Sequence, residues 1–198
     1  MRSPYDIKEQ EHAGKTIMQP TRIHNPRHHV YSIKIVLNEI SPPVWRRVHI
    51  TSDTSLADLH LIIQSTMGWN NDAAHCFTKD SVKLSPRARH RETPAGDHTP
   101  ILSYRDARVS HLFSAPGDTA LYTYSSGDGW THLLIFEETV TREKRVDYPR
   151  CVGGARACPP ESCKGTIGYL CMLEALKNPY HPEHEYALNR FGAYDPDT

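Results

Sequence analysis

Three features that mark other protein classes are missing from this sequence of 198 residues. It has no stretch of about eighteen consecutive apolar residues, the length that a membrane-spanning helix requires. Its first residues, Met1-Arg-Ser-Pro-Tyr-Asp, contain no apolar core of the kind found in a secretory signal. Lysine and arginine together number 23, as do aspartate and glutamate, so no net charge draws the chain towards nucleic acid or a membrane. We therefore expect a cytoplasmic protein without a membrane partner.

The cysteines also lack a familiar pattern. Cys151, Cys158, Cys163 and Cys171 are spaced C-x6-C-x4-C-x7-C, without the CxxC pair that is usual in zinc sites. In a reducing compartment such residues are not expected to form disulfides. We expect four small buried thiols and no cofactor. The alternative is a structural zinc ion that holds together the Gly- and Pro-rich segment 148–165, which we interpret as a loop.

Hydrophobic residues make up 38% of the chain, enough for one core and one soluble domain. Residues 1–29 are polar and are expected to form a flexible arm, so the folded domain spans residues 30–198. Alternating apolar residues predict a hairpin of strands 31–37 and 44–50, a short strand 75–78, and a second hairpin of strands 121–124 and 130–136. Helical spacing predicts helices over 55–67, 109–113, 168–176 and 182–190, and residues 79–108 are interpreted as a loop. His60 is expected on the surface of the first helix, and Trp45, Trp69 and Trp130 are expected to anchor the core.

The second hairpin carries the residues best suited to chemistry. On an extended strand, Asp128, Trp130 and His132 project to one face because side chains alternate with period two. An acid/base pair of Asp128 and His132 is one interpretation. The other is that Asp128 makes a side-chain turn bond and His132 is an ordinary strand residue. His75 and Glu161 complete the set of catalytic candidates for a hydrolase-like or metal-assisted enzyme.

Basic residues form two further candidate binding sites. Trp130 is a further candidate binding residue. Arg46 and Arg47 lie on the returning strand of the first hairpin. Lys83, Arg87, Arg89 and Arg91 are close together in the segment interpreted as a loop. Such clusters bind phosphates or acidic protein surfaces, although no aromatic residues interleave the second cluster to stack on bases.

An ordered set of short motifs resembles the plasmid pRiA4b ORF-3-like family, whose members also bear the name "TnpR" as passengers of insertion elements. The resemblance covers about residues 30–198. The matching residues are Pro42-Pro-Val-Trp-Arg-Arg47, Met67-Gly-Trp69, His75, Phe77, Tyr124, Gly127-Asp128, Trp130-Thr-His132, Tyr148-Pro149, Cys158-Pro-Pro-Glu161, Gly168-Tyr169 and Asp195-Pro196.

The resemblance implies one α+β domain with a β-grasp-like mixed sheet of hairpins, packed helices and a C-terminal helical pair. It also implies a protein often carried by mobile elements. Family members usually have an acid and an aromatic residue where this chain has Ser125 and Ser126, and an acid and a glycine at Ser162 and Lys164. They often have a histidine at Ala73. An accessory protein that binds a protein partner, or alternatively nucleic acid, is therefore the first functional hypothesis, and the enzyme is the second.

Overall fold

The computed structural model describes residues 29–86, 101–124 and 129–198. The predicted arm lies outside these residues apart from its last member, and so do Arg87, Arg89, Arg91 and Asp128. The strands are β1 (His29–Leu37), β2 (Trp45–Thr51), β3 (His75–Lys79), β4 (Val82–Ser85), β5 (Ile101–Ser103), β6 (Thr119–Tyr124), β7 (Trp130–Thr141) and β8 (Arg150–Ala155). The helices are α1 (Leu56–Met67), α2 (Val109–Leu112), the 3-10 turn η2 (Glu161–Cys163), α3 (Thr166–Lys177) and α4 (His184–Phe191).

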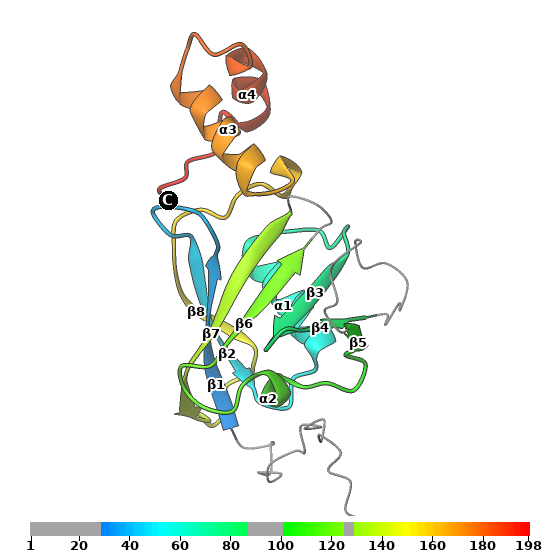
Figure 1. Ribbon diagram of the computed structural model, residues 1–198. Coiled ribbons are helices and arrows are strands. Elements are labelled where there is room, and N and C mark those ends of the chain that lie inside the picture. Colours follow the sequence, from blue (N-terminus) through cyan, green and yellow to red (C-terminus); the bar gives the residue numbers. More distant parts are fainter. Residues whose placement is uncertain (1–28, 87–100, 125–128) are drawn as a thin grey trace, which may run out of the picture.

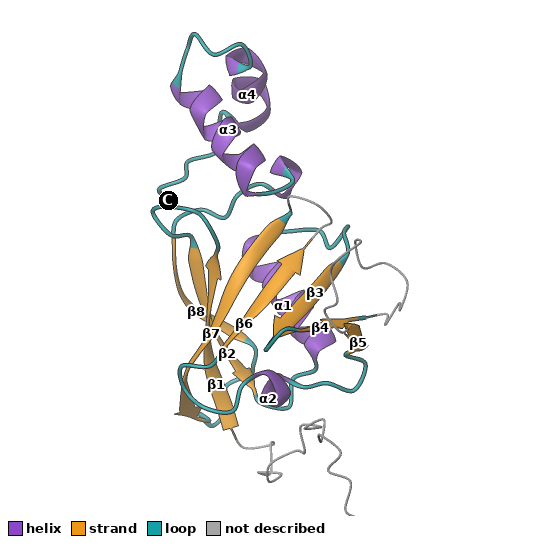
Figure 2. Ribbon diagram, viewed as in Figure 1, coloured by secondary structure: helices purple, strands orange, loops and turns teal. Residues whose placement is uncertain are grey.

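The strands form one sheet in the order β5-β4-β3-β6-β7-β1-β2-β8 (Figure 1). Every described pairing is antiparallel except that of β4 with β5. Both predicted hairpins, β1 with β2 and β6 with β7, are confirmed. The α+β class and the C-terminal helical pair are also confirmed: α3 and α4 stand beyond one end of the sheet (Figure 2). The helix α1 packs against this mixed sheet through the apolar side chains of the core.

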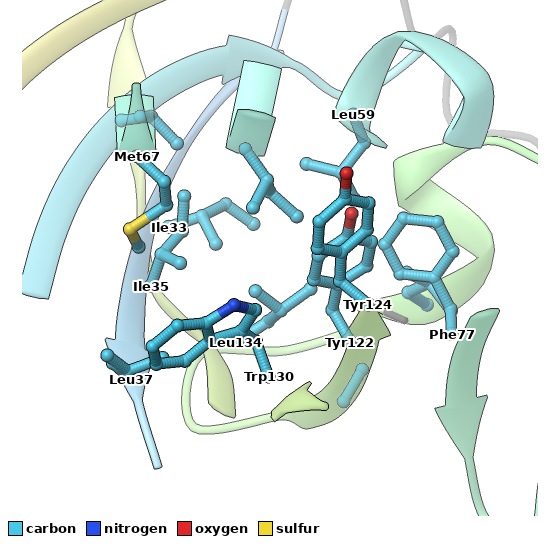
Figure 3. Close-up of a cluster of buried hydrophobic side chains, with 14 of the residues drawn as sticks. Ile33, Ile35, Leu37, Leu59, Met67, Phe77, Tyr122, Tyr124, Trp130 and Leu134 are labelled. Atoms are coloured by element: carbon cyan, nitrogen blue, oxygen red, sulfur yellow. The ribbon is translucent and has the colours of Figure 1, made fainter. Parts of the chain in front are cut away.

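Helix α1 begins and ends where its sequence predicts. Ser55 is the N-cap, because its hydroxyl accepts a hydrogen bond of 3.0 Å from the Asp58 backbone N–H. Gly68 ends the helix in the left-handed region, at a φ of 73°. Leu59, Ile63 and Met67 are buried on one face of α1 and belong to the core. Figure 3 shows Leu59 and Met67 beside apolar side chains of β1, β6 and β7. Burial of this apolar stripe holds α1 on the sheet.

Two segments interpreted as loops contain strands. Within 79–108, Asp80 and Ser81 adopt positive φ angles of 48° and 62° and form the turn that joins β3 to β4. The usual sequence of such a two-residue hairpin turn is Asn-Gly, so Asp80-Ser81 does not predict a hairpin from the sequence. Segment 148–165 contains β8, which pairs with β2 despite its glycines. A Cβ atom at Gly154 would lie 2.7 Å from Arg46 Cδ and 3.0 Å from the Trp45 carbonyl oxygen, so glycine permits the close approach of the two strands.

Two side-chain placements also differ from expectation. Trp69 and Trp130 are buried in the core as predicted, but Trp45 is only half-buried. Its ring lies beside two cations, 4.8 Å from Lys34 Nζ and 5.1 Å from the Arg47 guanidinium. His60, expected on the helix surface, is buried. In the part of the chain that the structure describes, no helix is long and apolar enough to cross a membrane.

The cap of α1 gives a test of the fold. We expect Ser55→Ala to lower the free energy of unfolding by about 1 kcal/mol, because the Asp58 N–H loses its acceptor at the start of the helix. Urea unfolding followed by circular dichroism measures this change. Ser65→Ala, an exposed change in the same helix, is the matched control and should leave stability the same or slightly higher. Equal effects of the two changes would contradict the capping role.

Candidate functional site

A chain of polar contacts crosses the core between α1 and β6. The Tyr122 hydroxyl accepts a hydrogen bond of 3.0 Å from Gln64 Nε2 and lies 2.7 Å from His60 Nδ1. The other ring nitrogen of His60 lies 2.5 Å from Asn71 Oδ1, which can only accept. His60 therefore carries its proton on Nε2, and Tyr122 donates to the unprotonated Nδ1. The Asn71 backbone N–H closes the chain by donating to Gln64 Oε1 at 3.0 Å.

His75, a predicted catalytic candidate, stacks on His60. The two ring centroids are 3.5 Å apart and the planes differ by 6°. His75 Nε2 also contacts the hydroxyl of the buried Tyr104, at 2.5 Å. Burial, with a smaller contribution from His60, lowers the pKa of His75 to about 4, and burial also lowers the pKa of His60. Both imidazoles are consequently neutral at neutral pH, which permits them to stack face to face.

A second polar centre surrounds the Tyr124 hydroxyl. It accepts hydrogen bonds from the backbone N–H groups of Asp72, at 2.7 Å, and Ala73, at 3.2 Å. It donates to Glu161 Oε1, and the other carboxylate oxygen accepts from the Asn70 N–H at 2.7 Å. Burial and the neighbouring carboxylate raise the pKa of Tyr124 to about 12. Glu161 thus ties the turn η2 to the loop that follows α1.

His132, also a catalytic candidate, is fully buried on β7. Its ring lies 5.5 Å from the Tyr122 ring and 5.3 Å from the Trp69 ring. Neither of its ring nitrogens, nor Trp130 Nε1, has a hydrogen-bond partner among the described residues. Burial lowers the pKa of His132 to about 3, so it is neutral and cannot be reached by solvent.

The structure therefore gathers His75, His132 and Glu161 around one aromatic cluster, formed by Trp69, Tyr122 and Tyr124. His75 and Glu161 have partners within the protein, and His132 is enclosed. Within the described ranges, no three His, Cys, Asp or Glu side chains are grouped so that they could hold a metal ion. The arrangement can keep three histidines neutral and bind the loop after α1 to η2.

The described basic candidates contact neighbouring groups. Arg47 donates to both carboxylate oxygens of Glu137, at 2.6 and 2.8 Å, on the face of the sheet that carries Trp45. Arg46 Nη1 donates to the carbonyl oxygens of Trp45, at 2.8 Å, and Ala155, at 3.2 Å. Lys83 is half-buried on β4. Arg47 thus links β2 to β7 across the intervening β1, and Arg46 links β2 to β8.

The four cysteines of the C-terminal half lie in different surroundings. Cys158 Sγ contacts the Thr66 carbonyl oxygen at 3.6 Å, and Cys163 Sγ contacts Met172 Sδ at 3.5 Å. Cys151 and Cys171 are exposed, so the expectation of buried thiols is wrong for both. Burial raises the pKa of Cys163 to about 11 and also raises that of Cys158. Protonated thiols are poor nucleophiles and poor metal ligands.

The aromatic cluster also attaches the C-terminal helical pair to the sheet. Trp69 Nε1 donates to the Pro159 carbonyl oxygen at 2.9 Å, just before η2. The ring of Trp130 lies 6.4 Å from that of Tyr169, the fully buried residue of α3. The hydroxyls of Tyr169 and Tyr194 are 3.0 Å apart, which joins α3 to the chain after α4. Trp130, predicted as a binding residue, is thus a buried support for α3.

The helical pair exposes apolar side chains that nothing in the described structure covers. Among the described residues, five of the nine large exposed hydrophobic side chains belong to the two helices or, for Tyr180, to the connection between them: Ile167, Leu170, Tyr180, Tyr186 and Leu188. A groove of about 360 Å³ lies between η2, α3 and α4. Of the five side chains, Tyr186 lines this groove, and Ile167 and Leu170 lie about one turn apart on α3. We use the name helical-pair surface for these five side chains and the groove together. Its concentration of apolar side chains is typical of a protein-binding surface.

Sequence reasoning overlooked His60, Gln64, Tyr104, Tyr122 and Tyr124 as members of the polar cluster. A signal for two of them was present. His60 and Gln64 each follow a core residue of α1 and complete its buried stripe at positions i, i+3, i+4 and i+7. A polar residue inside such a stripe must find a buried partner, and the tyrosines of β6 supply it.

The buried histidines predict a loss of stability in weak acid. Their pKa values are lowered in the folded state, so the unfolded chain binds more protons below about pH 6.5. Above this pH the neutral histidines make their full contribution to the free energy of unfolding. As the pH falls, each histidine should lower the free energy of unfolding by about 1.4 kcal/mol per pH unit, until the pH reaches its folded-state pKa, about 4 for His75. Urea unfolding between pH 7.5 and 4.5 measures how the free energy of unfolding changes with pH. The slope of the free energy of unfolding against pH should be smaller in His75→Gln than in the wild type. An unchanged slope there, or a matching reduction in the control His49→Gln, would count against this account.

The separated cysteines predict a metal-free protein. Elemental analysis of protein purified without chelator should find near-zero zinc, and chelator should not change thermal stability. Cys158→Ser should cost about 1–2 kcal/mol, because it places a hydroxyl among partly buried sulfur atoms. One equivalent of zinc per chain would show that this prediction is wrong.

Comparison with known proteins agrees with the fold. A crystal structure of MM3350, a protein of unknown function from Methanosarcina mazei Go1, is similar with a TM-score of 0.74 and 31% identity, over 86% of this chain and 94% of that one. The uncharacterized protein y4hQ of Sinorhizobium fredii (strain NBRC 101917 / NGR234) is 32% identical over 174 residues, which is 85% of this chain and 84% of the relative. The model of the plasmid pRiA4b ORF-3-like proteins matches residues 29–198, and the chain therefore belongs to that family.

Proposed function

We propose that this protein is a non-catalytic accessory protein of a mobile element and that it binds a protein partner through the helical-pair surface. The single observation that carries the proposal is the concentration of exposed apolar side chains on α3 and α4. Ile167, on α3, is 62% exposed, and so is Tyr186, on α4. Soluble proteins seldom leave such side chains together in water unless a partner covers them.

The construction of the helical pair supports the same function. The inward face of α3 is buried through Tyr169, Met172 and Ala175, whereas Ala187 is the residue that α4 buries. His184 Nδ1 donates to the Ala175 carbonyl oxygen at 2.7 Å and fixes the position of α4 on α3. A rigid pair of helices presents an apolar surface at a small entropic cost when a partner binds.

A protein partner fits the charges better than a nucleic acid does. Of the described basic candidates, Arg47 is paired with Glu137, and Arg46 donates to two backbone carbonyl oxygens. The chain has no net charge to attract phosphates over a distance. Nucleic acid is therefore the alternative partner, and treatment with nuclease distinguishes the two.

The enzyme hypothesis for His75, Asp128, His132 and Glu161 has less support. A general acid or base must reach a substrate, and His132 is fully buried with its pKa lowered to about 3. Glu161 is held between Tyr124 and the backbone of Asn70. The plasmid setting in the family's name favours an accessory role over a metabolic one.

The test is affinity capture from nuclease-treated lysate of the native host. We expect the wild type to retain a defined protein and Ile167→Asp/Leu170→Asp to lose it, because buried aspartates oppose an apolar interface. Leu102→Asp, on β5, is the matched control, since Leu102 is 53% exposed and Leu170 is 46% exposed. Circular dichroism first establishes that all three proteins are folded. Equal retention by all three, or retention that nuclease abolishes, would overturn the proposal.

A further inference from the structure

A second site lies apart from the helical pair, in a cleft of about 580 Å³ between the outer face of α1 and the end of the sheet formed by β2 and β8. Sites for small molecules usually measure roughly 300–1,000 Å³. The lining of this cleft comes from α1, from β2 and the turn after it, and from β8 and the chain before it.

Part of the lining of the cleft is apolar. Val48 is fully buried beneath it, Ile62 is half-buried, and Leu61 is 50% exposed. Tyr148 forms part of the facing wall, where its hydroxyl accepts a hydrogen bond of 3.3 Å from the Glu143 backbone N–H. The Arg142 guanidinium lies 5.7 Å from the centre of its ring. A ligand with an apolar body would bury these surfaces from water.

Charges of opposite sign border the same cleft. Asp53, in the turn after β2, and Asp58, on α1, line the cleft, and Arg150 lines it at the start of β8. Within the described part of the chain, none of these three side chains is in an ion pair, so the carboxylates and the guanidinium do not reach each other. Ser55 Oγ donates to Asp58 Oδ2 at 2.6 Å, which leaves Oδ1 available to a ligand. Carboxylates bind ammonium groups, and arginine binds carboxylates through two parallel hydrogen bonds.

We infer that this cleft binds a short peptide with free termini and apolar side chains. The ammonium group of the peptide lies at Asp53 and Asp58, its carboxylate at Arg150, and its side chains over Leu61, Ile62 and Tyr148. A ligand with both charges neutralises both unpaired sides of the cleft, which a simple amine or a simple acid does not. The cleft and the helical-pair surface share no residue, so the two proposals can fail separately.

Cys151 provides a direct readout because its thiol is exposed at the cleft, whereas the exposed thiol of Cys171 lies on α3 outside it. Alkylation of both is followed by mass spectrometry, with the dipeptide L-leucyl-L-phenylalanine as the probe. We expect the dipeptide to slow alkylation of Cys151 and to leave that of Cys171 unchanged. N-acetyl-leucyl-phenylalanine lacks the ammonium group and leucyl-phenylalanine amide lacks the carboxylate, so each should bind about tenfold more weakly.

Two charge changes complete the test. In Asp58→Asn, the free dipeptide should no longer bind more tightly than its N-acetyl form. In Arg150→Gln, it should no longer bind more tightly than its amide. Glu174→Gln, on the exposed face of α3, is the control and should preserve both. The inference is overturned if no probe protects Cys151 at concentrations up to about 10 mM. It is also overturned if the blocked peptides protect as well as the free one, or if Cys171 is protected equally.

Discussion

The arrangement of this domain depends on the need to satisfy two buried hydroxyl groups on neighbouring positions of one strand face, those of Tyr122 and Tyr124 on β6. A buried hydroxyl without a hydrogen-bond partner costs several kcal/mol, as judged from transfer out of water into a solvent that forms no hydrogen bonds. The fold must therefore bring a polar group to each of the two hydroxyls. Tyr122 obtains His60 and Gln64 from α1. Tyr124 obtains the backbone of Asp72 and Ala73 together with Glu161. These contacts fix α1, the loop after it and η2 relative to the central strands.

The same requirement explains why residues suited to catalysis are enclosed here. Histidine, tyrosine and glutamate close together suggest acid/base chemistry. Here His60, His75 and Glu161 instead bond to tyrosines of the core, and His132 is enclosed without a hydrogen-bond partner among the described residues. His60 and His75 stack with their ring centroids 3.5 Å apart, and burial lowers the pKa of both rings so that neither takes up a second proton at neutral pH. The hydrogen-bonded members of the cluster, from His60 to Glu161, favour one packing of the core, and they form the base of the domain.

That base determines what the C-terminal helices present to solvent. Trp130 and Tyr169 pack together, Trp69 bonds to Pro159, and Arg156 pairs with Asp197 at 3.0 Å, so the start of the helical pair and the end of the chain are both attached to the sheet. The remaining faces of α3 and α4 have no other element to cover them in the described structure. The proposed partner surface therefore follows from a short helical pair held at one end of a sheet (Figure 1).

Local patterns in the sequence were sufficient for the elements whose signals are local. The alternation in β1 and β7, the cap at Ser55 and the stop at Gly68 predict both hairpins and α1, because each depends on neighbouring residues alone. The glycines of β8 indicated a loop, and only pairing with β2 made them a strand. His60 looked like a surface residue until β6 placed a hydroxyl beside it. Likewise, His75, His132 and Glu161 come from distant segments, so whether they face solvent or each other was decided by tertiary packing, since burial and hydrogen-bond partners are properties of neighbours in space.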